Sequence, residues 1–148
     1  MPSKPAARIA ALILLLLASS AQAQENACKH TDDCVYGSAV ADRWILGGRA
    51  QKKGDFDAAL AEYRQALAAA GAVTAAGMSD KQIRDLRECA AAGSEARIAA
   101  AGAGRQYLAL RGRSPQTILD AQDAANKAFY AAIARKDAER PDLATSCP

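Results

Sequence analysis

The sequence predicts an all-α fold, cross-linked by disulfides, for the part of the chain that follows an N-terminal leader. From Ser38 onward the chain is rich in alanine, leucine, arginine, lysine and glutamine, which favour helices. No segment there alternates apolar and polar residues with the period of a strand. The four cysteines form an even set, which in an exported chain predicts two disulfides. No linker interrupts residues 38–148, so we expect one helical domain with a C-terminal tail.

The first 23 residues have the three parts of a Sec signal peptide. Lys4 and Arg8 supply positive charge, an apolar run follows, and Ala21-Gln22-Ala23 places small residues where signal peptidase cuts. A membrane span needs about 20 apolar residues, and this run has about half of that number. We therefore predict cleavage after Ala23, no integral membrane anchor in the mature chain, and a periplasmic or secreted location. The alternatives are an uncleaved anchor and a lipoprotein modified at Cys28, although the residues before Cys28 are polar.

Residues 24–37 read as an irregular arm that contains two of the cysteines. All four cysteines follow the predicted cut: Cys28, Cys34, Cys89 and Cys147. Of the three possible pairings we favour Cys28–Cys34 with Cys89–Cys147, and the alternatives pair the arm with the tail. Disulfides would matter here, because a chain with only 5% aromatic residues and many alanines buries little area per residue.

Two helices are expected in the first half of the domain. The first covers residues 39–53 and ends at Gly54, and Asp55 is a suitable cap for the second. The apolar residues of the second helix recur three and four positions apart, as on one helical face: Phe56, Ala59, Leu60, Tyr63, Ala66 and Leu67. Gly71 and Gly77 mark its end and a loop.

The second half is expected to hold further helices with clear start signals. Ser79 and Gln82 have the spacing of a capping box and begin a helix through Cys89. Three glycines are expected to divide the stretch up to Leu110 into two pieces: Gly93, Gly102 and Gly104. Ser114-Pro115 begins a last long helix, which Pro141 ends. Its apolar positions are Ile118, Leu119, Ala125, Phe129, Ala132 and Ile133.

Residues Val40–Val73 resemble a single tetratricopeptide repeat. The matching residues are Leu46-Gly47, Gly54-Asp55-Phe56-Asp57, Ala59-Leu60, Tyr63 and Ala66-Leu67. In this pattern small residues let two antiparallel helices approach closely, glycine makes the turn, and aromatic residues fill the space between the helices. The sequence departs from the pattern at Arg43, Ala50 and Gly71, and no second copy follows in register. A single repeat cannot bury its apolar face, so the remaining helices should extend it into a small α-solenoid or a bundle.

The resemblance implies a concave groove that holds a protein or peptide partner. The positions that would face this groove are Ala41, Trp44, Gly48, Gln51 and Lys52. Trp44 is the only tryptophan and is a suitable binding anchor. The alternative places Trp44 in the core, packed against the last helix.

No pattern of catalytic residues was found, so we expect no enzyme and no cofactor. His30 is the only histidine and lies between Cys28 and Cys34, which leaves a metal site as an alternative to a disulfide arm. Removing Lys4 and Arg8 with the signal takes two charges from the net +3 and leaves +1, which gives no footprint for nucleic acid. We therefore expect an exported tetratricopeptide-like protein–protein interaction module, an adaptor or accessory factor of the cell envelope. The alternative is a helical envelope protein that binds a small ligand or a metal, or protects unfolded clients.

Overall fold

The computed structural model describes residues 35–148, and it is all-helical with no strand in that range. The predicted signal peptide, Cys28, His30 and Cys34 lie outside the described residues. The helices are α3 (Ser38–Lys52), α4 (Phe56–Ala70), α5 (Asp80–Arg111), α6 (Pro115–Glu139) and α7 (Pro141–Ala144). The predicted all-α class is therefore confirmed for the described part of the chain.

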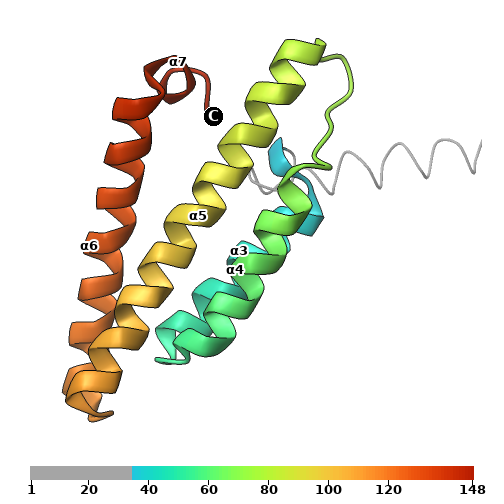
Figure 1. Ribbon diagram of the computed structural model, residues 1–148. Helices are drawn as coiled ribbons and strands as arrows, with labels where there is room; N and C mark the ends of the chain where they lie inside the picture. The colour runs from blue at the N-terminus through green and yellow to red at the C-terminus, as the bar shows by residue number, and fades with distance from the viewer. Residues whose placement is uncertain (1–34) are drawn as a thin grey trace, which may run out of the picture.

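Each long helix packs mainly against its neighbours in sequence. The closest pairs are α3 with α4, α4 with α5, and α5 with α6, so α5 lies between α4 and α6 (Figure 1). The start of α6 also reaches the end of α3. There the Gln122 amide donates a hydrogen bond to the Lys52 carbonyl at 2.8 Å, and Arg113 donates to the Gly54 carbonyl at 3.0 Å. The first bond joins α6 to α3, and the second joins the loop before α6 to the turn after α3.

Local signals placed the helix starts correctly. The Asp55 carboxylate accepts a hydrogen bond from the Ala58 amide at 3.0 Å, and Ser79 forms the expected capping box with Gln82. Ser114 caps α6, and its neighbouring proline occupies the first turn. Gly54 has a φ of +76°, a conformation that only glycine adopts at low cost, so it makes the turn between α3 and α4.

The predicted break in the third helix is wrong, because α5 is continuous for 32 residues. Glycine lowers helix propensity by about 1 kcal/mol relative to alanine, but packing can offset that cost. Gly93 lies against the Trp44 ring, where an added Cβ atom would be 3.1 Å away, and Gly104 lies directly against the Phe56 ring. Two of the three glycines therefore admit aromatic side chains from other helices and keep the helix intact.

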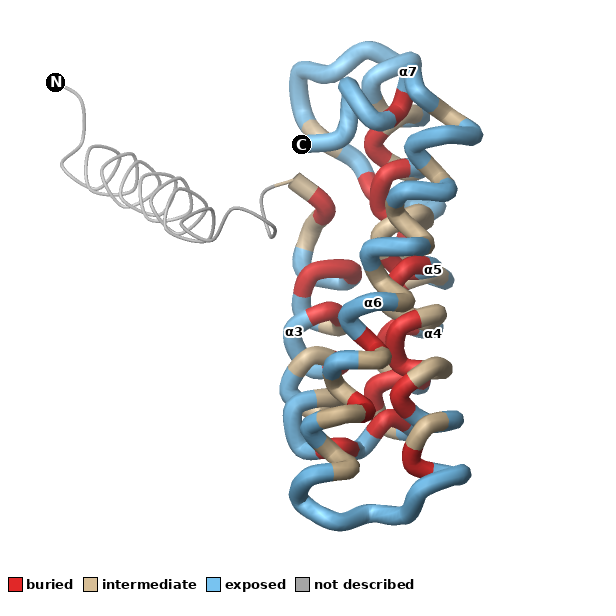
Figure 2. The backbone as a smooth tube through the Cα atoms, turned by 90° about the vertical axis from the view of Figure 1, so that its left-hand side faces the viewer, coloured by how far each residue is buried: buried red, intermediate tan, exposed pale blue. Residues whose placement is uncertain are grey.

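The core lies along the inner faces of α3, α4 and α5. Figure 2 shows buried residues along α4. The predicted face of α4 is buried except for Leu67, which is half-buried. By contrast, α6 buries only Ala121 and Ala125. Phe129 and Ile133 are half-buried, and Leu119 is exposed. The inner face of α6 is thus only partly covered by protein.

The C-terminal tail, residues 141–148, packs back toward α5. Pro141 follows the end of α6 as predicted, but it also begins the short α7, which was not predicted. Leu143 is buried, and Cys147 forms a disulfide with Cys89 of α5, with 5.6 Å between the two Cα atoms. The favoured Cys89–Cys147 pairing is therefore confirmed.

Candidate functional site

A cavity of about 350 Å³ lies among α3, α5, α6 and the C-terminal tail. We call it the Trp44 cavity. Its walls include Tyr36, Trp44, Gly93, Arg97, Ile133, Lys136, Leu143, Cys147 and Pro148. Its volume is at the lower end of the range for ligand pockets in proteins. Such a volume accepts one or two side chains of a bound segment, or a small organic molecule.

Trp44 is both a core residue and a wall of this cavity. Its side chain is only 8% exposed, and its indole N–H donates a hydrogen bond to the Ser94 hydroxyl at 2.9 Å. The Ser94 hydroxyl in turn donates to the Ala90 carbonyl at 2.8 Å. Because the indole N–H is already used inside the protein, Trp44 offers the cavity its apolar ring.

Arg97 links three elements around the Trp44 ring. Its guanidinium carbon lies 3.9 Å from the Trp44 ring centroid and 5.4 Å from that of Phe129 on α6. Its Nη1 donates a hydrogen bond to the Gly93 carbonyl at 3.0 Å. Tyr36 meets Trp44 edge to face, with 5.1 Å between ring centroids. Cation–π contacts of this kind hold a positive charge against an aromatic surface at the cavity wall.

The wall of the Trp44 cavity carries both cationic and acidic side chains. Arg97 and Lys136 line it together with one acid, Asp137. Lys136 also lies 3.8 Å from the Glu95 carboxylate, an ion pair at the limit of contact distance. Arg97 and Lys136 are thus the two groups of the wall that can meet a negative charge on a ligand.

Tyr63 lies in the core between α3 and α4. Burial raises the pKa of the Tyr63 phenol above its ordinary value of 10.0, and the positive charge of Arg97 acts in the opposite direction. The Tyr63 hydroxyl donates a long hydrogen bond, 3.4 Å, to the Gln51 side chain. The phenol therefore stays neutral at physiological pH.

The structure separates the five predicted groove positions. Only Trp44 lines the cavity. Ala41 is fully buried, and Gly48 is half-buried with open space beyond its Cα atom. Gln51 and Lys52 lie at the end of α3, where their carbonyls face Gln122 of α6.

Sequence reasoning missed the residues that α5, α6 and the tail contribute to the cavity. Ile133 belongs to the predicted apolar face of the last helix. That position indicates that Ile133 faces the other helices, but it does not indicate that Ile133 lines a cavity. Nothing in the local sequence marks Arg97, because its aromatic partners are more than thirty residues away in both directions. Lys136 follows Ile133 on the same face of α6 and could have been placed there by helical spacing.

A second hollow of about 270 Å³ lies on the other side of the tail. It is lined by Val35, Met78, Gln82, Asp85, Leu86, Ser146 and Pro148. Met78 is one of the large apolar residues that remain exposed, at 42%. Pro148 lines both hollows, so the end of the tail separates them.

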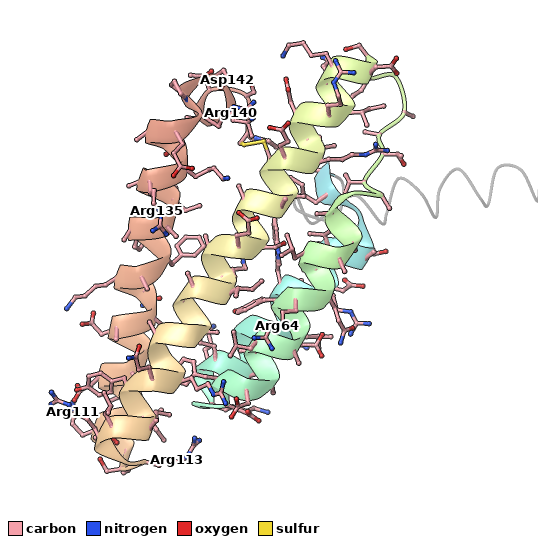
Figure 3. The ribbon with its side chains drawn as sticks, viewed as in Figure 1. Arg64, Arg111, Arg113, Arg135, Arg140 and Asp142 are labelled. Atoms are coloured by element: carbon pink, nitrogen blue, oxygen red, sulfur yellow. A yellow bond between two sulfur atoms is a disulfide. The ribbon has the colours of Figure 1, made fainter. Side chains whose placement is uncertain are left out.

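Each end of the helical bundle carries labelled charged side chains (Figure 3), and the disulfide lies at only one of these ends. Figure 3 shows Arg111 and Arg113 where α5 meets α6, and Arg140 with Asp142 at the opposite end, next to the disulfide. Arg111 lies over the Tyr107 ring, with its guanidinium carbon 5.2 Å from the ring centroid. The Trp44 cavity lies at the disulfide end.

Residues 35–148 contain no group of three or more His, Cys, Asp or Glu side chains placed to hold a metal ion. In the same part of the chain, no helix has both the length and the hydrophobicity of a membrane span. No family model, curated protein or solved structure matches this chain.

Proposed function

We propose that the mature protein is an exported protein–protein interaction module, an adaptor or accessory factor of the cell envelope. In this proposal α3 and α4 form a tetratricopeptide-like hairpin that α5 and α6 complete. A segment of the partner protein inserts into the Trp44 cavity. The Cys89–Cys147 disulfide supports a location in an oxidising compartment, where such bonds persist.

The packing of α3 against α4 supports the tetratricopeptide-like assignment. Gly47 lies directly under the Tyr63 ring, so the absence of a side chain lets the two helices approach. Ala59 and Ala66, the small residues of the pattern on α4, are fully buried. Gly54 makes the turn between the helices with a positive φ. These are the positions at which a repeat of this family uses small residues.

The observation that carries the proposal is the composition of the Trp44 cavity. Its apolar surface comes from a fixed indole ring, Ile133 and Leu143, while Arg97 and Lys136 place positive charge beside it. A rigid aromatic wall costs little conformational entropy when a partner binds. The partner side chain that fits best is therefore apolar with an acidic group close by.

The sharpest test compares two charge reversals on α6. Lys136 lines the cavity, whereas Lys127 pairs with Asp123 at 2.7 Å and does not line it. With the oxidised protein as bait in envelope extract, we expect one stoichiometric protein partner. Lys136→Glu should abolish capture, and Lys127→Glu should leave it unchanged.

Two outcomes would contradict this function. Capture that survives Lys136→Glu would place the partner on another surface. Capture of many unrelated proteins, or of none while a small molecule co-purifies, would favour the alternative of client protection or small-ligand binding.

A further inference from the structure

We propose that the Cys89–Cys147 disulfide is a redox latch on the Trp44 cavity. In the disulfide form the C-terminal tail closes one wall of the cavity, and in the dithiol form the tail is released and the cavity opens. The expected change in ligand affinity on reduction rests on the proposed function. The opening of the cavity on reduction does not depend on it.

The tail contributes a continuous part of the cavity wall. Leu143, Ala144, Cys147 and Pro148 all line the Trp44 cavity. Ser146 and Pro148 line the second hollow on the other side. Displacing the tail would therefore expose the Trp44 ring from one side and Leu86 from the other.

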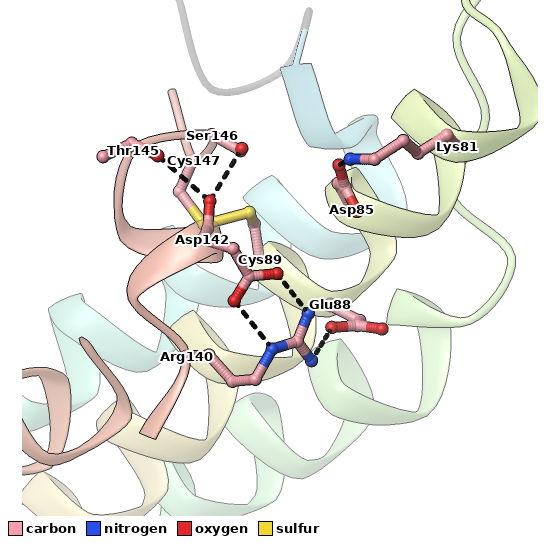
Figure 4. The surroundings of a disulfide bond; sticks show 9 residues. All are labelled: Lys81, Asp85, Glu88, Cys89, Arg140, Asp142, Thr145, Ser146 and Cys147. Carbon is pink, nitrogen blue, oxygen red and sulfur yellow. Dashed lines mark hydrogen bonds and ion pairs between the residues drawn. A yellow bond between two sulfur atoms is a disulfide. The ribbon is translucent and has the colours of Figure 1, made fainter. Parts of the chain in front are cut away.

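Noncovalent contacts hold the tail only weakly. Leu143 is its only buried residue, and α7 has four residues, which is too short to be stable alone. Arg140 donates hydrogen bonds to Asp142 at 2.9 Å and to Glu88 at 2.6 Å (Figure 4). Both ion pairs are solvent-exposed, and exposed pairs contribute little to stability. The disulfide is therefore the main tether of the tail.

The two cysteine residues differ in exposure. Cys89 is 4% exposed, whereas Cys147 belongs to the exposed end of the tail. We therefore expect the thiolate of a dithiol reductant to attack the sulfur of Cys147, the more exposed of the two cysteines. It forms a mixed disulfide with Cys147, and Cys89 leaves with the electron pair and takes up a proton.

The second thiolate of the reductant completes the exchange. It attacks the reductant's own sulfur in the mixed disulfide, and Cys147 leaves as a thiolate and is protonated. In total, two electrons and two protons pass from the dithiol to the protein, and the reductant becomes a disulfide. The reverse reaction with an oxidised dithiol closes the latch.

Ligand binding and reduction are then linked. A ligand that contacts the tail wall binds the disulfide form more tightly than the dithiol form. By thermodynamic reciprocity the same ligand makes the disulfide harder to reduce by the same factor.

Trp44 provides a direct readout, because it is the only tryptophan of the chain and lines the cavity. The test protein carries Cys28→Ser and Cys34→Ser, so that dithiothreitol can reduce only the Cys89–Cys147 bond. Acrylamide quenching of Trp44 fluorescence is measured in native buffer before and after reduction, together with the helical circular dichroism signal. We expect the quenching constant to rise at least about twofold while the helical signal is retained.

Unchanged quenching after complete reduction would overturn the latch. Loss of the helical signal on reduction would overturn it too, because the latch requires the four long helices to stay folded. A second variant checks the result without reductant: Cys89→Ser in a chain that ends at Arg140 should show the quenching of the reduced protein.

Anilinonaphthalene sulfonate, an aromatic anion, serves as the ligand probe. We expect it to bind the oxidised protein, and its Kd should rise at least about threefold on reduction. Equal or tighter binding by the dithiol form would overturn the linkage between binding and reduction. If the dye does not bind the oxidised protein, the cavity does not take an apolar ligand with a negative charge, which contradicts the ligand chemistry of the proposed function. Whether the tail opens is decided by the quenching experiment alone.

Discussion

Trp44 and Ser94 lie 50 positions apart in the chain and share a buried hydrogen bond of 2.9 Å between the indole N–H and the hydroxyl oxygen. The hydroxyl donates onward to the Ala90 carbonyl, so every group in this short chain has a partner. The bond fixes the indole between α3 and α5. As a result, the ring that lines the cavity is held in one orientation before any ligand arrives.

Removing the acceptor should be costly. Ser94→Ala leaves a buried indole N–H without a partner, which we expect to lower the free energy of unfolding by about 1–3 kcal/mol. Trp44→Phe removes the donor and part of the packing. The double variant should cost less than the sum of the two single variants, because the second change removes a group that is already unpaired.

Urea unfolding followed by circular dichroism measures all three variants, since Trp44→Phe removes the only tryptophan signal. A Ser94→Ala protein as stable as the wild type would show that the indole N–H reaches another acceptor or solvent. Additive effects of the two substitutions would contradict the coupling.

Gly47 and Gly48 form a matched pair on α3. A Cβ atom at Gly47 would collide with the Tyr63 ring, whereas nothing lies within 4 Å of a Cβ atom at Gly48. We expect Gly47→Ala to destabilise the protein by about 1–3 kcal/mol through overpacking. Gly48→Ala should stabilise it by about 0.5–1 kcal/mol, because alanine restricts the unfolded chain and favours the helix. Thermal unfolding of both variants measures the contrast, and equal effects would mean that α3 and α4 are not in close contact at Gly47.

Features encoded by neighbouring residues could be predicted from the sequence. The caps at Asp55, Ser79 and Ser114 each depend on a side chain and an amide three residues later, so their signals are local. The turn at Gly54 was predictable for the same reason. The starts of the four long helices were therefore predicted to within one residue, and the all-α class was correct for the described residues.

Features that depend on contacts between distant residues could not be predicted. The glycines of α5 read as helix breakers, because nothing nearby in the sequence shows that the Trp44 and Phe56 rings occupy the space beside Gly93 and Gly104. The same applies to the cavity, where α6 and the tail supply walls that a single repeat does not contain. The repeat resemblance predicted a groove along α3 alone, and of its five positions only Trp44 lines the cavity.

The disulfide should contribute strongly to stability. Cys89 and Cys147 are 58 positions apart, so the bond closes a long loop that contains most of α5 and all of α6. Cross-links of this kind stabilise proteins by about 2–4 kcal/mol, mainly by restricting the unfolded chain. We expect Cys89→Ser/Cys147→Ser to lower the free energy of unfolding by that amount in urea titrations. A change below about 1 kcal/mol would show that the tail is strained by the bond or held by other contacts.

The last prediction concerns stability at alkaline pH. Burial raises the pKa of Tyr63 above 10.0, the ordinary value that the phenol has in the unfolded chain. Between pH 10.0 and the higher folded-state pKa, the unfolded chain releases the Tyr63 proton and the folded protein keeps it. Ionisation therefore favours the unfolded state, so the contribution of Tyr63 to stability is complete below pH 10.0 and is lost as the pH rises through this window.

Tyr63→Phe removes the titrating group and should flatten the decline in the free energy of unfolding above pH 10.0. Tyr130→Phe is the matched control, because this side chain is 70% exposed in the folded protein and should leave the wild-type slope unchanged. Below pH 10.0 the Tyr63→Phe protein should lose no more than about 0.5–1.5 kcal/mol, since its hydrogen bond to Gln51 is long. Urea titrations from pH 8 to pH 11 on the three proteins measure the slopes. A parallel decline in the free energy of unfolding for Tyr63→Phe and the wild type would contradict the prediction. It would mean that the Tyr63 phenol reaches solvent and that α3 and α4 pack less closely than the contact between Gly47 and the Tyr63 ring implies.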